Sequence, residues 1–163
     1  MKKFVFVDTE TTGLDPKNDK LVELTYAVEN EKPVTLFFGV KKVPAFIDDL
    51  TKFSERKVYD EPEASKVDIH DFLKASDGNT MVAANPSFDK GFLEANLLFN
   101  FHYRMLDVQS YAMARLDLDY MPSMNEIASL LSELGYRGFT KPDHSSRNDV
   151  LFMREAFNVL RYM

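Results

Sequence analysis

Two acidic residues, Asp8 and Glu10, directly follow a short apolar run and are separated by a single threonine. On an extended chain, residues two apart point to the same side of the strand, about 6.6 Å apart along it. No Lys or Arg lies between Phe4 and Pro16 to neutralise the pair. Because two like charges near a core are costly without a compensating cation, the pattern indicates a hard divalent metal ion with oxygen ligands. Considered alone, the pair is explained more simply as a solvated polar turn.

Asp89 is a third acid whose position in the sequence favours a role in a site. With Phe92, Leu93 and Leu97 it follows a spacing of i, i+3, i+4 and i+8, which places it at the head of an apolar helical stripe. An acid in the first turn of a helix is also stabilised by the helix dipole. The dipole does not require the core-facing side, so the two explanations are about equally strong.

Asp149 heads a second apolar stripe, shared with Met153, Ala156 and Leu160 at i, i+4, i+7 and i+11. The competing explanation is a capping box, with Ser146 as the helix cap and an acid three residues later. The capping box is the stronger explanation when this segment is considered alone.

His144 precedes Asp149 by five residues, and the two can approach each other only if the histidine lies on a loop before the helix. Pro142 and the two serines that follow the histidine favour such a loop. A loop histidine beside a metal cluster is suited to take a proton from water, although an isolated surface histidine is the commoner case. His70 and His102 have no such context and are interpreted as structural.

Apolar patterning predicts the elements that would carry these residues. Strands are expected at residues 2–7, 21–28, 34–40, 81–84 and 104–108. Helices are expected at residues 67–74, 86–99, 109–116, 124–134 and 148–162, with Asn85 capping the second and Gly135 ending the fourth. Residues 44–66 should form short helices and loops. Three strands in a row, followed by alternating helices and strands, predict an α/β fold with a mixed sheet flanked by helices.

The composition is that of a globular protein. The 163 residues suit one domain, spanning residues 1–163. No stretch approaches the roughly 20 apolar residues that span a bilayer, and the N-terminal apolar run is too short for a signal peptide. The absence of cysteine excludes disulfides and thiolate metal sites, which fits a reducing cytoplasm. The net charge of −6 argues against a protein that coats nucleic acid, although acidic metal ligands would account for part of it.

In order, these segments resemble the three motifs of the DEDDh, or DnaQ-like, family of 3′–5′ exonucleases. The sequence DTETTGL at residues 8–14 is similar to the first motif, NPSFDKGFL at residues 85–93 to the second, and HSSRND at residues 144–149 to the third. Their shared order and spacing cover nearly the whole chain, which outweighs the separate explanations by a turn, a dipole and a cap. The resemblance implies an RNase H-like fold, a five-stranded mixed sheet with helices on both sides.

Two positions depart from the family pattern. Ser146 stands where the third motif usually has alanine, and a hydroxyl is small enough that little loss is expected. Ala84 stands where a histidine often precedes the asparagine of the second motif, which removes one possible phosphate or packing contact.

The resemblance implies a two-metal mechanism. Asp8, Glu10 and Asp149 would hold one ion. Asp8 would bridge to a second ion, which Asp89 would contact partly through water. Two ions about 3.5–4 Å apart would clamp the scissile phosphate, and a water activated by one of them would pass its proton to His144. Mg²⁺ or Mn²⁺ suits such an all-oxygen site with open positions.

The resemblance also implies how a 3′ end would be recognised without regard to sequence. Leu14 and Phe88 would sandwich the terminal base, and aromatic stacking of this kind is worth about 1–3 kcal/mol per base. The backbone near Thr11 would contact the 3′-hydroxyl, and Asn85 belongs to the same expected substrate-binding set. Leu14 and Phe88 are explained equally well as ordinary core residues. Weaker candidates for phosphate contacts are the basic residues near the motifs: Lys90, Arg137, Lys141 and Arg147.

The first motif is more similar to epsilon proofreading subunits than to oligoribonucleases, which favours single-stranded DNA as substrate. Trimming of RNA or short oligonucleotides stays open, because the metal chemistry ignores the 2′-hydroxyl. A binding or scaffold module is the alternative outside enzymes, and the complete set of acids argues against it. Because the chain ends directly after the last helix, we expect a free-standing nuclease, or one that docks through its body onto a DNA polymerase or another replication or repair protein. We expect a cytoplasmic protein with no membrane partner.

Overall fold

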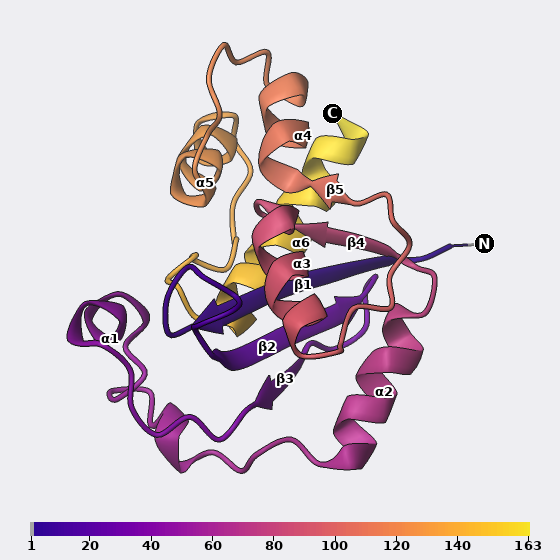
Figure 1. The fold of residues 1–163 in the computed structure, drawn as a ribbon. Coiled ribbons are helices and arrows are strands. Elements are labelled where there is room, and N and C mark those ends of the chain that lie inside the picture. The colour runs from indigo at the N-terminus through magenta and orange to yellow at the C-terminus, as the bar shows by residue number, and fades with distance from the viewer. Residues whose placement is uncertain (1) are drawn as a thin grey trace.

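The computed structural model describes residues 2–163. A five-stranded mixed sheet forms its centre, in the order β3-β2-β1-β4-β5 (Figure 1). The strands are β1 (Phe4–Thr11), β2 (Leu21–Val28), β3 (Val34–Phe37), β4 (Thr80–Ala83) and β5 (Leu106–Asp107). β1 pairs antiparallel with β2 and parallel with β4, so it lies in the middle of the sheet. The predicted mixed sheet is confirmed.

Helices surround this sheet on both faces (Figure 1). They are α1 (Ala45–Thr51), the 3₁₀ helix η1 (Val58–Asp60), α2 (Lys66–Ser76), α3 (Pro86–Ala95), α4 (Val108–Arg115), α5 (Met124–Glu133) and α6 (Ser146–Tyr162). Every residue of β2 is buried, as expected for a strand covered from both sides. Within residues 2–163, none of the helices combines the length and apolar character needed to cross a membrane.

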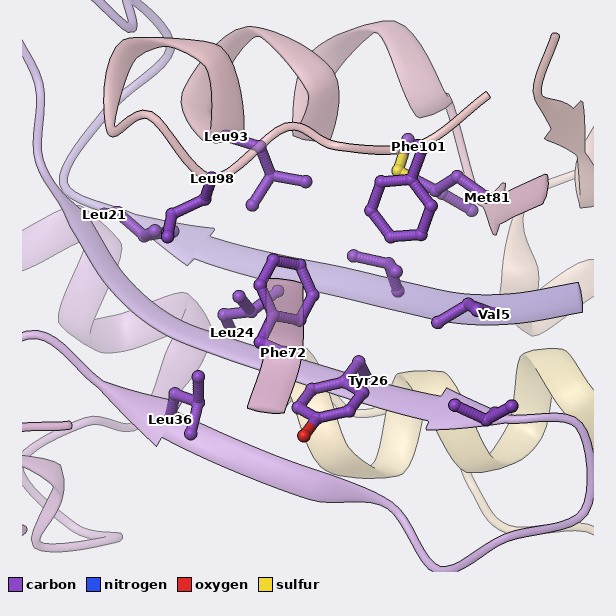
Figure 2. Close-up of a cluster of buried hydrophobic side chains, with 13 residues drawn as sticks. Val5, Leu21, Leu24, Tyr26, Leu36, Phe72, Met81, Leu93, Leu98 and Phe101 are labelled. Carbon is purple, nitrogen blue, oxygen red and sulfur yellow. The ribbon is translucent and has the colours of Figure 1, made fainter. Parts of the chain in front are cut away.

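Alternation along β1 divides the core into two layers. Val5 and Val7 belong to a cluster that Phe72 of α2 and Leu93 of α3 complete, and Figure 2 shows these side chains gathered on one face of the sheet. Phe6 belongs to the cluster on the other face, which is built with α4 and α6. Because successive side chains of a strand point to opposite faces, the residues that follow Val7 are distributed between the same two layers.

Four strand predictions differ from the structure at their ends, although β4 differs by only one residue at each end. β1 does not stop at residue 7 but continues to Thr11, because it stays paired with β2 over that length. Asp8 and Glu10 therefore lie within a strand rather than in a turn after one. β3 ends at Phe37 instead of residue 40, where Gly39 turns the chain with a φ of 69°. β5 is shortened to two residues.

Helix α3 ends at Ala95, four residues earlier than predicted. The side chain of Asn96 donates to the carbonyl of Phe92 at 2.7 Å, and Leu97 then adopts a left-handed φ of 57°. Leu97 is 88% exposed, and Leu98 is buried in its place. The predicted apolar stripe is correct for Phe92 and wrong for Leu97. The left-handed turn at Leu97 points this side chain to solvent, and the next residue, Leu98, packs into the core instead.

Candidate active site

Three of the predicted acids meet at the carboxyl end of β1. Asp8 and Glu10 follow Phe6 on the side of the strand that faces α6, and Asp149 lies in the first turn of α6. One carboxylate oxygen from each residue lies within 4.8 Å of the other two. Strand periodicity and the position of one helix terminus are therefore enough to gather acids that are far apart in the sequence.

Asp8 is the most constrained of the three acids. Its Oδ2 is buried and has no hydrogen-bond partner among residues 2–163. Burial, followed by the charges of Glu10, Asp89 and Asp149, raises the pKa of Asp8 well above its usual value. Without a cation, the folded protein therefore holds this carboxyl group in an unfavourable environment for its charged form.

Glu10 and Asp149 are in a similar position. Burial raises the pKa of Glu10 well above its usual value, and the charges of Glu23 and Asp149 add to the effect. Burial raises the pKa of Asp149 to about 6, although its Oδ1 accepts a hydrogen bond from the backbone N–H of Asp143 at 3.0 Å. Like charges at this separation need a compensating positive charge.

Asp89 lies beside this group and approaches from the other layer. Thr9 points to the α3 side of β1, and it donates to Asp89 Oδ1 from its backbone N–H at 3.0 Å and from its hydroxyl at 2.7 Å. Asp89 is only 2% exposed, and burial raises its pKa to about 7 in spite of these bonds. Its oxygens are outside the group formed by Asp8, Glu10 and Asp149, but its charge still acts on Asp8.

The donor set fits a hard divalent cation. All the converging atoms are carboxylate oxygens, which Mg²⁺ and Mn²⁺ accept as ligands. The buried Asp8 Oδ2 lacks a partner that a cation would provide. A cation would also remove the repulsion that raises the pKa of Asp8 and of Glu10.

His144 lies on the loop before α6, as predicted. It is exposed and has a left-handed φ of 60°. Asp143 shapes this loop, because its Oδ1 accepts from the backbone N–H of Ser145 at 3.1 Å and its Oδ2 accepts from the side chain of Asn148 at 2.8 Å. The imidazole is close enough to Asp149 that a positive charge on it would favour the ionised carboxylate.

The structure excludes the alternative explanation of Asp149 by a capping box at Ser146. Ser145 is the cap, and its hydroxyl accepts from the backbone N–H of Asn148. Ser146 is fully buried, and it shares a hydrogen bond of 2.7 Å with the hydroxyl of Thr25 on β2. Asp149 is one position too far along to serve as the capping partner, so its place in the acidic group has no local explanation.

A family model described as Exonuclease, RNase_T, matches residues 5–157. The chain belongs to this exonuclease family. The 3′-5′ exonuclease DinG of Bacillus subtilis (strain 168) is 34% identical over 102 residues, which are 59% of this chain and 11% of DinG. The epsilon subunit of DNA polymerase III from Treponema pallidum (strain Nichols) is 28% identical over 99 residues, which are 58% of this chain and 46% of the subunit.

The exonuclease fold is shared with a solved structure. The zinc-bound complex of Escherichia coli exonuclease I with single-stranded DNA superposes with a TM-score of 0.70 and 14% identity, covering 99% of this chain and 41% of that one. The predicted DnaQ-like family and RNase H-like fold are thereby confirmed. This exonuclease chain spans less than half the length of each of these three proteins.

The residues expected to bind substrate are found along the same edge. Leu14 is 82% exposed, which excludes its interpretation as a core residue. It follows Gly13, where any Cβ would overlap the carboxylate of Asp19. Phe88 is half-buried, and its ring centroid lies 5.1 Å from that of Phe92.

Two further members of that set have local hydrogen bonds. Thr11 is buried, and its hydroxyl donates to the carbonyl of Gly13 at 2.6 Å. Asn85 is the N-cap of α3, as predicted, and has a left-handed φ of 56°, but its side chain makes no capping hydrogen bond within the described chain. Its exposed side chain is therefore not committed to α3.

Three of the four basic residues near the motifs have partners within the described chain. Lys90 pairs with Glu94 at 3.5 Å. Arg147 donates to the carbonyl of Pro33 at 3.1 Å, and Arg137 donates to the carbonyls of Ser132 and Tyr136. These contacts give each of the three side chains a role that needs no phosphate.

Sequence reasoning missed Glu23 and Arg56. Glu23 lies directly opposite Glu10 in the β1–β2 ladder and is 1% exposed. It pairs with Arg56, whose Nη1 lies 3.1 Å from Glu23 Oε2. The signal that could have revealed it is one acid in the middle of the otherwise apolar segment of residues 21–28.

Proposed function

We propose that this exonuclease removes nucleotides from the 3′ end of single-stranded DNA, with two Mg²⁺ or Mn²⁺ ions as cofactors. The observation that carries the proposal is the group of three carboxylates around the buried Asp8 Oδ2, which has no partner within residues 2–163. Phosphodiester hydrolysis needs positive charge near the scissile phosphate, and such a group recruits it. Membership of an exonuclease family supports the choice of reaction.

The acids would divide the metal binding among them. Asp8, Glu10 and Asp149 would hold one ion. Asp8 and Asp89 would hold the other, with Asp89 acting through water because Thr9 already occupies one of its oxygens. When bound, the ions supply a water of lowered pKa and a positive charge for the leaving 3′ oxygen.

His144 would act as the general base. The imidazole is exposed on a loop next to Asp149, from where it would accept the proton of the attacking water. The hydrogen bonds of Asp143 to the residues after His144 hold the loop in the shape that this role requires.

Leu14 and Phe88 would hold the terminal base. An exposed leucine in a loop fixed by Asp19 can cover one face of a base, and a phenylalanine at the start of α3 can cover the other. Such contacts work with any base because every base has an apolar face. Thr11 and Asn85 would contact the sugar and phosphate of the same nucleotide.

Single-stranded DNA is favoured over RNA by the kinship with a DNA polymerase III epsilon subunit, and by the complex of exonuclease I with single-stranded DNA. The relation to epsilon also supports docking on a DNA polymerase. Trimming of RNA or short oligonucleotides is the second candidate, because no acid of the site distinguishes the two sugars.

The test compares DNA and RNA strands of one sequence, each labelled at the 5′ end, with Mg²⁺, Mn²⁺ or chelator. We expect a ladder of products shortened from the 3′ end of DNA, and no products in chelator. Asp8→Asn should remove the ladder, whereas Asp71→Asn, which neutralises an exposed acid on α2, should leave it unchanged.

Three results would contradict the proposal in different ways. Cleavage that persists in chelator would exclude the metal mechanism. Internal fragments without a ladder would exclude an exonuclease acting from the 3′ end. A clear preference for RNA would replace the DNA substrate with the second candidate.

A further inference from the structure

Glu23 is a buried acid in the same region whose oxygens are already engaged. Its Oε1 accepts from the backbone N–H of Ser146 at 2.9 Å and from Arg56 Nη2 at 3.2 Å, and its Oε2 accepts from Arg56 Nη1 at 3.1 Å. It therefore has a different role from Asp8, whose buried Oδ2 has no hydrogen-bond partner within residues 2–163.

We propose that Glu23 and Arg56 are a positioning pair: Arg56 holds the Glu23 carboxylate, and Glu23 fixes the start of α6 so that Asp149 reaches Asp8 and Glu10. The inference rests on the proposed metal site. It assigns to the segment between β3 and α2 a part in building that site, through a side chain that touches neither metal nor substrate.

The contact between Glu23 and α6 attaches the first residue of the helix to β2. Ser146 is the first residue of α6, and Asp149 follows three residues later, almost one turn on. Thr25, two residues from Glu23 on the same face of β2, holds the hydroxyl of Ser146 at 2.7 Å. The helix start is thus tied to β2 at its backbone and at its side chain.

Arg56 is held in turn from several sides. Its Nε donates to the carbonyl of Thr51 at 2.9 Å, and its guanidinium lies 5.3 Å from the ring centroid of Phe53. The two Nη atoms form a bidentate interaction with the Glu23 carboxylate, a geometry that lysine cannot reproduce. A buried carboxylate that loses such a partner pays its full desolvation cost, so Glu23 would turn away from Ser146.

A positioning role and a purely electrostatic role predict opposite effects of removing Arg56 on the affinity for the cation. Loss of a positive charge near Glu10 would by itself strengthen the binding of a cation. Loss of the bidentate interaction would release Glu23 and the start of α6, and would weaken binding because the carboxylate of Asp149 is displaced. The sign of the change therefore distinguishes the two roles.

The experiment measures Mn²⁺ binding to the full chain by titration calorimetry, and hydrogen exchange of the Ser146 amide in chelator. For Arg56→Met we expect Mn²⁺ binding that is about 10–100-fold weaker, the usual effect of losing a partner of a metal ligand shell. We also expect faster exchange at Ser146. The Mn²⁺ concentration for half-maximal activity should rise, while the KM for DNA at saturating Mn²⁺ stays unchanged.

The double variant Glu23→Gln/Arg56→Met should recover most of the binding, because a glutamine oxygen still accepts from Ser146 and leaves no buried charge without a partner. Arg154→Met is the matched control. Arg154 also joins α6 to the chain after β2, donating to the carbonyl of Glu31 at 2.6 Å, but at the far end of that strand. Its removal should change neither readout.

Unchanged or tighter Mn²⁺ binding in Arg56→Met would overturn the positioning role, and so would a double variant that binds no better than the single one. If Arg56→Met does not fold, Arg56→Lys takes its place, and it should still show faster exchange at Ser146 and weaker binding. A wild-type chain that binds no Mn²⁺ would overturn the metal site itself, and this inference with it.

Discussion

At the scale of single residues, the site is defined by carboxylates that folding leaves without sufficient compensation. Asp8 has a buried oxygen with no partner in the described chain, and Asp149 keeps one backbone donor. Folding alone gains nothing from this arrangement, because each charge raises the pKa of its neighbours. Stability and cation binding should therefore respond in opposite directions when one acid is removed.

Asp149→Ala should reduce hydrolysis to the level of chelator-treated enzyme. In chelator, its thermal unfolding midpoint should equal or exceed that of the wild type, because one source of repulsion is gone. Activity assays and unfolding scans on the same preparation measure both effects. Wild-type turnover in this variant would exclude Asp149 from the metal site.

His144→Ala should lower kcat by about 10²–10⁴-fold, the usual range for a lost general base. The affinity for Mn²⁺ should stay close to that of the wild type, because the imidazole is not part of the carboxylate group. His70→Ala, which removes an exposed histidine on α2, is the control. An unchanged kcat would remove His144 from the mechanism.

At the scale of elements, the start of α6 contributes most to the site, since the loop histidine, the cap and one acid occur within six residues. Ser145 caps the helix and also bonds to Asp143, with an Oγ–Oδ1 distance of 2.6 Å. The helix start and the shape of the His144 loop therefore depend on one hydroxyl.

Ser145→Ala should lower the free energy of unfolding by about 1 kcal/mol, the typical cost of a lost cap. Ser146→Ala should cost less, because Thr25 keeps a second hydroxyl partner in Thr35 at 2.7 Å. Denaturant unfolding of the two variants measures the difference. The opposite ranking would restore Ser146 as the cap.

The sequence was sufficient for the type of each long element but not for its ends. β2 matched its predicted bounds because every position in it is buried. β1 continues beyond its last apolar residue because its polar residues stay paired with β2. The acids at residues 8, 10 and 149 were recognisable from spacing and from the family motifs. Glu23 was not, because its role depends on Arg56 and on the start of α6, both distant in the chain.

At the scale of the whole molecule, the site lies where both layers of the core meet the end of β1. The α6 side supplies Asp149, and the α3 side supplies Asp89 through Thr9. Asp89 is buried and the three acids on the α6 side are partly buried, so the stability of the metal-free protein should depend on pH through all four.

In chelator, stability should fall as the pH rises from about 4 to about 7. The pKa of Asp89 is raised to about 7 and that of Asp149 to about 6, from a usual 3.8. Over this range the folded protein binds more protons than the unfolded chain, so its stability decreases with pH. Unfolding scans of wild type and Asp89→Asn measure the effect, and the variant should show a shallower dependence.

Added Mn²⁺ should raise the unfolding midpoint most at neutral pH, because protons compete with the metal for the same oxygens at lower pH.

A wild-type midpoint that rises between about pH 4 and pH 7 in chelator, relative to Asp89→Asn, would contradict the raised pKa of Asp89.

The alternation along β1 also means that the face on which each side chain lies depends on the exact number of residues before it in the strand. Asp8 and Glu10 face α6 because they lie two and four residues after Phe6, which faces α6. Thr9 lies three residues after Phe6, so it faces the other side and reaches Asp89. One residue inserted between Phe4 and Asp8 would exchange the faces of all that follows, turning the acids into the apolar layer of α3. Every motif would still be present in such a chain, yet a threonine would stand where the proposed metal ion needs a carboxylate.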